Sequence, residues 1–267
     1  MALNLVCETV GSGPPLVVLH GLFGSGSNWR SVARELAATH SVTSVDLRNH
    51  GASPWADLMD YGEMADDVLQ LIDRLKLDRP TLMGHSMGGK VAMALALRHP
   101  DRIGRLIVVD IAPISYADTL TAFAEAMRSA DVMAAASRAE VQRRLEATAP
   151  DPEVVPFLMQ NLIARNDHFD WRLNLLGIGL AMPQLSAFPS ALLGLRFDGP
   201  VTVIAGRDSD YVVDHDGAAF EPMFTRVAVQ VIENAGHWVH ADQPRAFLAS
   251  VRQTLLPDRH PSVAQPN

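Results

Sequence analysis

Short apolar runs rich in β-branched residues alternate along this chain with helical patterns, and this alternation constrains the fold more than any other feature. The runs lie at residues 16–19, 42–45, 81–84 and 106–109, after an expected edge strand at 3–10. Runs without polar alternation are typical of strands buried on both faces, as in a parallel sheet. Apolar residues spaced three or four apart predict helices between them, most clearly over 61–75 and 87–98. The chain is therefore expected to form an α/β structure, a parallel sheet with helices on both faces.

The alternation stops between residues 115 and 189. Ala, Met, Leu and Phe dominate there, with charged residues at helical intervals, and no strong strand pattern is present. This segment is predicted to be a helical cap, inserted into a core made of residues 1–114 and 190–256. Strand patterns resume at 201–205 and 227–232, and a final helix follows Pro244. Residues 257–267 hold three prolines and few apolar side chains, and we expect them to form a flexible tail.

Bulk composition excludes several classes of partner. Hydrophobic residues make up 48% of the 267 residues and charged residues 19%, values that are ordinary for a globular protein with a large core. The net charge is −8 and no run of Lys or Arg stands out, so nucleic acid and anionic membranes are poor candidate partners. Nothing in the composition specifies an oligomeric state.

The chain has the features expected of a soluble cytoplasmic protein. Cys7 is the only cysteine, so an intrachain disulfide is impossible, which fits a reducing compartment. The first residues lack a basic segment followed by an apolar one, so no signal peptide is expected. The longest apolar runs are far too short to span a bilayer.

The segment Gly-His-Ser-Met-Gly at residues 84–88 fits the pattern G-x-S-x-G and lies between a predicted strand and a predicted helix. A serine nucleophile in this position needs a sharp, strained turn, so its flanking residues must be small, as Gly84 and Gly88 are. The turn lifts the Ser86 hydroxyl clear of the sheet and places it at a helix N-terminus, where N–H groups favour negative charge. Ser86 is the candidate nucleophile. The alternative is a glycine-rich turn without chemistry.

A serine hydroxyl is a poor nucleophile until a base removes its proton. The base is expected last in chain order, and His237 lies just after the last predicted strand. A loop at the carboxyl edge of the sheet can reach the nucleophile. His240 is the nearest competitor, but the small residues Ala235 and Gly236 allow the chain to turn tightly before His237. The alternative role for His237 is a structural hydrogen bond.

A carboxylate is needed to fix the tautomer of the base and to stabilise the imidazolium. Asp110 ends the predicted strand at 106–109, whereas Asp208 and Asp210 follow the later strand at 201–205. Both loops lie at the catalytic edge of the sheet, so the residues alone leave the choice open. For each aspartate the alternative is a capping or loop role.

An oxyanion hole needs two backbone N–H groups directed at the developing alkoxide. One is expected from Met87, directly after the nucleophile. The other is expected from Leu22, or alternatively Phe23, in the glycine-containing turn after residue 20. This chemistry needs no metal or organic cofactor, and the sequence has no clustered Cys and His at zinc spacing.

The substrate pocket is expected between the sheet edge and the insertion, with Trp238 at its wall. An apolar pocket favours an acyl chain or aromatic ester over a sugar or a polyanion. Each candidate lining residue could instead hold the cap helices together. The candidates from the insertion are Phe157, Met159, Leu162, Phe169, Trp171, Leu175, Leu176 and Met182.

Two alternatives to ester hydrolysis by Ser86 involve the same residues. An acyl-CoA thioesterase would need the same Ser, His and Asp, and a basic patch near the cap involving Arg165 or Arg172 would favour it. A ligand receptor on a hydrolase scaffold, without catalysis, is a rival from a different class. Dehalogenases and epoxide hydrolases that use a carboxylate nucleophile are disfavoured, because the residue in the nucleophile position is a serine, Ser86.

Several segments together resemble the α/β-hydrolase superfamily and, within it, the small YbfF-type and ABHD11-like esterases. The resemblance runs from about residue 16 to residue 247. It implies an α/β-hydrolase fold with a mostly parallel sheet of about seven strands, and a carboxylic ester hydrolase acting on a small-molecule ester, with a thioester as the alternative substrate. The segments are HGLFGS (residues 20–25), VDLRNHGASP (45–54), GHSMGGK (84–90), VDIAP (109–113), WRLN (171–174) and GHWVHA (236–241).

The resemblance also bears on the acid and on several other polar residues. In most of the superfamily the acid follows the later strand, three residues after a glycine, and that position here is Ser209. In the YbfF-like group the acid ends the earlier strand, and Asp110 matches it, with Asp208 and Asp210 as alternatives. The family motifs also contain residues that we interpret as structural, not as proton carriers: His20, Asp46, Arg48 and His85.

Overall fold

A seven-stranded sheet forms the centre of the protein. The computed structural model describes residues 1–213, 215 and 217–256, and the predicted tail at 257–267 lies outside them. The strand order is β1-β3-β2-β4-β5-β8-β9, and every neighbouring pair is parallel except β1 with β3. The predicted fold is confirmed. The strands are β1 (Cys7–Val10), β2 (Pro15–Leu19), β3 (Ser41–Val45), β4 (Thr81–His85), β5 (Arg105–Val109), β8 (Phe197–Gly206) and β9 (Phe224–Ile232).

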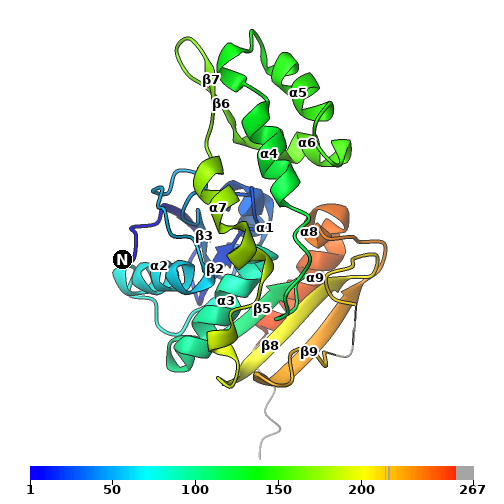
Figure 1. The fold of residues 1–267 in the computed structure, drawn as a ribbon. Coiled ribbons are helices and arrows are strands. Elements are labelled where there is room, and N and C mark those ends of the chain that lie inside the picture. Colours follow the sequence, from blue (N-terminus) through cyan, green and yellow to red (C-terminus); the bar gives the residue numbers. More distant parts are fainter. Residues whose placement is uncertain (214, 216, 257–267) are drawn as a thin grey trace, which may run out of the picture.

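Helices cover both faces of the sheet (Figure 1). Successive residues of β2 show why, because Val17 and Leu19 join the apolar cluster under α2 and α3, while Leu16 and Val18 join the cluster under α1 and α9. A strand with apolar side chains on both faces can only be buried by two layers. The helices are α1 (Arg30–Leu36), α2 (Tyr61–Arg74), α3 (Met87–Arg98), α8 (Val239–Asp242) and α9 (Pro244–Leu255).

The segment between β5 and β8 rises above the sheet as a separate lobe, and its last helix runs back past α3 toward β8 (Figure 1). It contains a two-stranded antiparallel ribbon, β6 with β7, which corrects the expectation of no strand here. The apolar cluster under α2 and α3 continues into this lobe. The division into core and cap at residues 114 and 190 stays a prediction. The elements are α4 (Thr121–Ser129), α5 (Arg138–Glu146), α6 (Val155–Leu158), β6 (Leu162–Ala164), β7 (Phe169–Trp171) and α7 (Leu175–Ser186).

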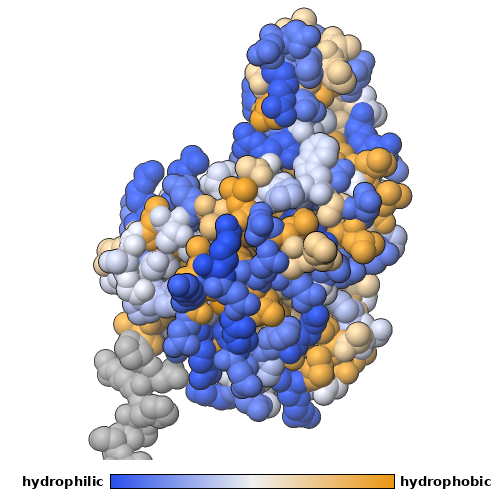
Figure 2. Space-filling model, turned by 90° about the vertical axis from the view of Figure 1, so that its left-hand side faces the viewer, coloured by the Kyte–Doolittle hydropathy of each residue, from blue (hydrophilic) through white to orange (hydrophobic). Residues whose placement is uncertain are grey.

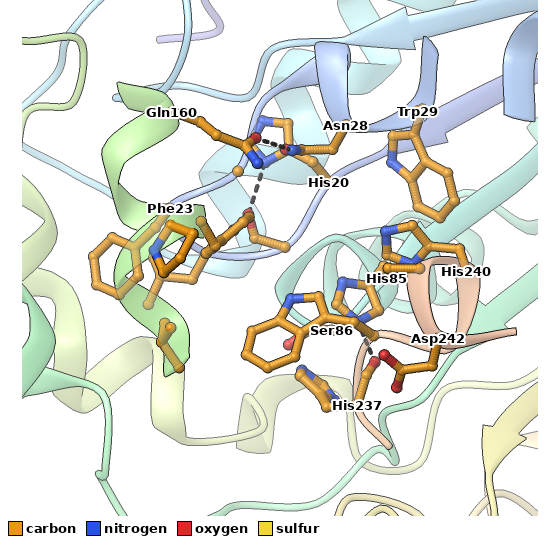
Figure 3. Close-up of a pocket in the computed structure, with 18 of the residues that line it drawn as sticks. His20, Phe23, Asn28, Trp29, His85, Ser86, Gln160, His237, His240 and Asp242 are labelled. Carbon is orange, nitrogen blue, oxygen red and sulfur yellow. Dashed lines mark hydrogen bonds between the residues drawn. The ribbon is translucent and has the colours of Figure 1, made fainter. Parts of the chain in front are cut away.

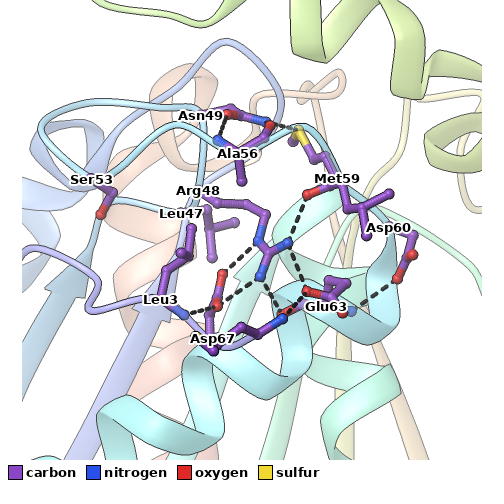
Figure 4. Close-up of polar contacts among 12 residues, drawn as sticks. Leu3, Leu47, Arg48, Asn49, Ser53, Ala56, Met59, Asp60, Glu63 and Asp67 are labelled. Carbon is purple, nitrogen blue, oxygen red and sulfur yellow. Dashed lines mark hydrogen bonds and ion pairs between the residues drawn. The ribbon is translucent and has the colours of Figure 1, made fainter.

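A buried arginine ties the loop after β3 to α2 (Figure 4). Arg48 is 1% exposed and donates to both oxygens of the buried Asp67, at 2.7 and 2.8 Å. It also donates to Glu63 Oε2 at 3.1 Å and to the Leu58 carbonyl at 2.7 Å. A buried charge is tolerated only when it is paired and hydrogen-bonded, as here. The arrangement agrees with the structural role predicted for Arg48.

The surface of the protein carries both hydrophobic and hydrophilic residues. Figure 2 shows the upper lobe narrowing above the body, with hydrophobic residues scattered among hydrophilic ones on this face. Across the described part of the chain, none of the helices has both the length and the apolar character needed to cross a membrane.

Candidate active site

Ser86 occupies a sharp bend between β4 and α3. Its φ of 52° and ψ of −119° lie outside the regions that a non-glycine residue normally adopts, at a cost of about 1–3 kcal/mol. The bend is fixed from both sides, because Ser86 N donates to the Val109 carbonyl at 3.0 Å and the Ser86 carbonyl accepts from Gly89 N at 2.9 Å. The serine therefore stands at the N-terminus of α3, at the carboxyl edge of the sheet.

The two flanking glycines are required by close backbone contacts. A Cβ at Gly84 would lie 2.1 Å from the Gly88 carbonyl oxygen. A Cβ at Gly88 would lie 2.6 Å from the carbonyl oxygens of Leu19 and His20, at the end of β2. No side chain fits at either position without moving α3 off the sheet.

His237 and Asp110 form a hydrogen-bonded pair. His237 Nδ1 lies 2.8 Å from Asp110 Oδ2, and the Asp110 side chain is fully buried while that of His237 is 18% exposed. Gly206 N donates to Asp110 Oδ1 at 2.9 Å, and the Ser209 hydroxyl donates to Oδ2. A carboxylate with these donors is an acceptor, so the imidazole carries its proton on Nδ1 and its Nε2 is free to act as a base.

Two further contacts hold the His237 ring and its backbone. The Tyr211 ring stacks on the imidazole with centroids 4.0 Å apart. His85, the residue before the serine, lies 2.8 Å from the His237 carbonyl through Nε2, which is the donor. Burial, and then the neighbouring His237, hold the pKa of His85 well below its usual value, so it is neutral. Sequence reasoning missed this contact, since it joins residues far apart in the chain.

The other candidates for the acid and the base have different surroundings. Asp208 and Asp210 are exposed, and Ser209 between them points its hydroxyl at Asp110. His240 Nδ1 is buried with no hydrogen-bond partner, and burial lowers the pKa of His240 to about 4. The residue that pairs with a carboxylate is thus His237, and the carboxylate is Asp110.

The residues expected to supply the oxyanion hole lie at the same edge of the sheet as Ser86. Met87 is the first residue of α3, so its N–H has no acceptor within the helix. Leu22 follows β2 and lines the cavity together with Ser86. The N–H of Phe23 is already engaged, because it donates to His50 Nε2 at 3.2 Å. Of the two alternatives in this turn, the geometry favours Leu22.

Buried histidines shape the turns after β2 and β3. His20 Nε2 accepts from Leu47 N at 3.0 Å, and His50 Nδ1 donates to the Arg48 carbonyl at 2.9 Å. Burial lowers the pKa of His20 to about 4 and that of His50 to about 3. Asp46 accepts from Gly26 N at 2.7 Å. These contacts agree with the turn-shaping role predicted for His20 and Asp46.

A cavity of about 830 Å³ opens in front of Ser86 and His237 (Figure 3). The insertion contributes Phe157 and Gln160, and Gln160 accepts from Asn28 Nδ2 at 2.9 Å across it. A second cavity, of about 40 Å³, also reaches Ser86. Sequence reasoning missed several residues of the large cavity, which come from helices and loops far apart in the chain: Trp29, Thr119, Leu120, Phe123, Tyr211 and Leu248.

The predicted pocket residues divide into three groups. Phe157 and Trp238 line the large cavity, and Met182 lines the small one. The other predicted residues line neither cavity, which corrects that part of the expectation. Most of them pack inside the insertion, because its short helices need their own apolar contacts, whereas Leu176 points to solvent. These residues are Met159, Leu162, Phe169, Trp171, Leu175 and Leu176.

Within the described residues, no group of three or more His, Cys, Asp or Glu side chains is arranged to hold a metal ion. The groups that lie together at this edge of the sheet are the Ser86 hydroxyl, the His237 imidazole and the buried Asp110 carboxylate.

Comparison with known proteins places these features in a family. Residues 14–145 match the family described as the alpha/beta hydrolase fold. The chain is 36% identical to the sn-1-specific diacylglycerol lipase ABHD11 of Danio rerio over 94% of this chain and 81% of that protein. It is 33% identical to the esterase YbfF of Escherichia coli (strain K12), over 96% and 99%. A solved marine microorganism esterase, 34% identical, superposes with a TM-score of 0.90 over 95% of this chain and all 100% of that one.

Proposed function

This chain belongs to the alpha/beta hydrolase fold family, as a member of its YbfF and ABHD11 type, and we propose that it is a serine carboxylesterase. Its relatives carry the names esterase and lipase, and hydrolysis of ester bonds is the activity common to those names. The finer proposal is that it cleaves short- to medium-chain or aromatic carboxylic esters through an acyl-enzyme on Ser86.

One observation carries the proposal. A strained serine at a helix N-terminus and a histidine hydrogen-bonded to a buried carboxylate line one cavity, which is large enough for an ester. This combination activates a hydroxyl, because the imidazole accepts the serine proton while the carboxylate stabilises the resulting imidazolium.

The proposed reaction has two halves. His237 Nε2 takes the proton of the Ser86 hydroxyl as Oγ attacks the ester carbonyl. The Leu22 and Met87 amides hold the oxyanion, and each such donor typically contributes about 3 kcal/mol. The C–O bond to the alcohol breaks and His237 gives the proton to the leaving oxygen. A water, deprotonated by the same imidazole, then releases the acid and restores Ser86.

The thioesterase alternative receives no specific support. Arg165 forms an ion pair with Asp170 at 3.5 Å, and neither Arg165 nor Arg172 lines either cavity. A CoA ester carries several phosphate charges and needs cations at the mouth of its site. The receptor alternative is addressed by the labelling experiment below.

Covalent labelling with a fluorophosphonate tests the proposal. We expect the wild-type protein to be labelled at Ser86 and to hydrolyse p-nitrophenyl butyrate faster than butyryl-CoA. Ser86→Ala should lose both labelling and hydrolysis, while Ser190→Ala, at an exposed serine just after the insertion, should keep both.

Three outcomes would count against the proposal. A folded wild-type protein that is not labelled would favour a binding function. Labelling that persists in Ser86→Ala would show that another residue is the nucleophile. Faster turnover of butyryl-CoA would favour the thioesterase.

A further inference from the structure

The two cavities that meet at Ser86 differ about twentyfold in volume, roughly 830 Å³ against 40 Å³. They share the wall around the serine, and the shared residues are Leu22, Ser86, Thr119, Leu120 and Tyr211. An ester bound at Ser86 has two substituents on its carbonyl carbon, the acyl chain and the alkoxy group. The two cavities thus offer separate places for them.

His237 distinguishes the two cavities. It lines the large cavity, together with Trp238 and Phe157, and does not line the small one. The small cavity is instead bounded by Met87, whose N–H is proposed for the oxyanion hole, and by Ile111 and Tyr116 after β5. The base therefore faces only one side of the bound carbonyl.

The chemistry assigns the substituents. As the alkoxy C–O bond breaks, the proton taken from Ser86 passes from His237 to the leaving oxygen, which must lie within hydrogen-bond reach of the imidazole. The alcohol part thus extends into the cavity that His237 lines. We infer that the small cavity holds the acyl chain and that the preferred substrates are esters of short acids with large apolar alcohols. This inference rests on the proposed esterase function.

The size of the small cavity limits the acyl chain. At about 40 Å³, it offers about one twentieth of the space of the large cavity. A short acyl chain such as acetyl or butyryl is therefore expected to fit it better than an octanoyl chain.

The wall that α7 contributes to the small cavity is held in place by Tyr61 and Lys90, which also line this cavity. It is formed by Met182 and Leu185 of α7, and the Leu185 carbonyl accepts from the Tyr61 hydroxyl at 2.6 Å. The buried Lys90 ammonium donates to the carbonyls of Ser186 and Ala187, at 3.2 and 2.9 Å. A cation bound to the last carbonyls of a helix is favourable, so the end of α7 is fixed and does not easily make room.

Two ester series measured on the wild-type protein test the inference. With p-nitrophenol as a fixed alcohol, we expect kcat/KM to fall roughly tenfold or more from butyrate to octanoate. With acetate as a fixed acid, a pH-stat assay should show 2-naphthyl and decyl esters hydrolysed at least as well as ethyl acetate. Octanoate hydrolysed as well as butyrate, or a loss of turnover with large alcohols, would overturn the assignment.

A matched pair of leucine variants locates the selectivity. Leu185→Ala enlarges the small cavity and should raise the octanoate-to-butyrate ratio roughly tenfold. Leu248→Ala alters the large cavity and should leave that ratio unchanged while changing the alcohol preference. If Leu185→Ala does not fold, as judged by its thermal melting curve, Met182→Ala replaces it. An equal response of both variants would overturn the inference.

Failure of this inference is distinguishable from failure of the proposed function. Fluorophosphonate labelling of Ser86 together with the reverse chain-length ranking would reject only the acyl assignment. Absence of both labelling and ester hydrolysis would reject both.

Discussion

At the residue scale, Ser86 and Asp110 share an uncommon backbone feature. Both have positive φ, at 52° and 50°. They directly follow His85 and Val109, which are register partners on the neighbouring strands β4 and β5. Each strand thus bends sharply at the same level of the sheet. The strain costs about 1–3 kcal/mol per residue, and the buried surroundings maintain it.

The role of Asp110 leads to a first prediction. Asp110→Asn should lower kcat/KM on p-nitrophenyl butyrate by about 10⁴-fold, because an amide cannot hold the required tautomer of His237. Asp208→Asn and Asp210→Asn, at exposed positions, should stay within about threefold of wild type. Steady-state kinetics on the purified variants measures the effect. A large loss of kcat/KM in either control variant, with a mild effect of Asp110→Asn, would show that the acid lies in the later loop.

Sequence patterns predict some residues of this site and not others. The serine bend has a local signature, since a Cβ at Gly84 would collide with Gly88, although the need for glycine at 88 itself comes from the distant carbonyls of Leu19 and His20. The choice between Asp110 and the later aspartates depends on how two loops approach each other, and no local pattern reports that distance. The contact of His85 with the His237 carbonyl has no sequence signal for the same reason.

At the element scale, the close contact between α3 and β2 positions the nucleophile. Gly88 permits this contact, because a methyl group there would lie 2.6 Å from the carbonyls that end β2. The position of the helix, and with it the Met87 amide, depends on this glycine.

A pair of glycine substitutions tests the contact between α3 and β2. Gly88→Ala should destabilise the protein by several kcal/mol, about 3 or more, and abolish ester hydrolysis. Gly179→Ala, in α7 where a Cβ meets nothing within 4 Å, should be neutral or stabilise by about 0.5–1 kcal/mol. Urea unfolding measures both. A Gly88→Ala protein as stable and active as wild type would show that the contact is unnecessary.

The helix α3 and the five-residue strands of the sheet follow their sequence patterns, whereas the three-residue strands of the insertion do not. The apolar spacing predicts a helix at 87–98, and α3 has those bounds. The strands β6 and β7 have only three residues each, too few to show a period of two. In the insertion, apolar residues facing its own interior and residues facing the cavity look alike in sequence. For this reason most of the residues predicted to line the pocket line neither of the two cavities.

At the scale of the whole molecule, buried neutral histidines make stability depend on pH. Burial lowers the pKa of His20 and His240 to about 4 and that of His50 to about 3, whereas histidines in the unfolded chain titrate near 6.5. Below pH 6.5 the unfolded chain binds protons that the folded protein does not. The stability contributed by these groups is therefore complete above pH 6.5 and is lost as the pH falls toward 4.

This linkage gives a measurable prediction. Each of these histidines should cost on the order of 3 kcal/mol of unfolding free energy between pH 7 and pH 4. Urea unfolding at several pH values should show the unfolding free energy falling between pH 7 and pH 4. In His50→Asn this fall should be smaller, by about the contribution of one histidine. An unchanged slope in His50→Asn would show that this histidine takes up protons in the folded protein.

The proposed esterase function requires Ser86 to form a covalent bond with the acyl group. An aryl carbamate measures this most directly, because its acyl-enzyme hydrolyses slowly and can be located by peptide mass spectrometry. We predict release of one equivalent of the phenol and a carbamoyl group on Ser86, both absent in His237→Ala. Release of the phenol with the carbamoyl group on another residue, or with Ser86 unmodified, would contradict the account.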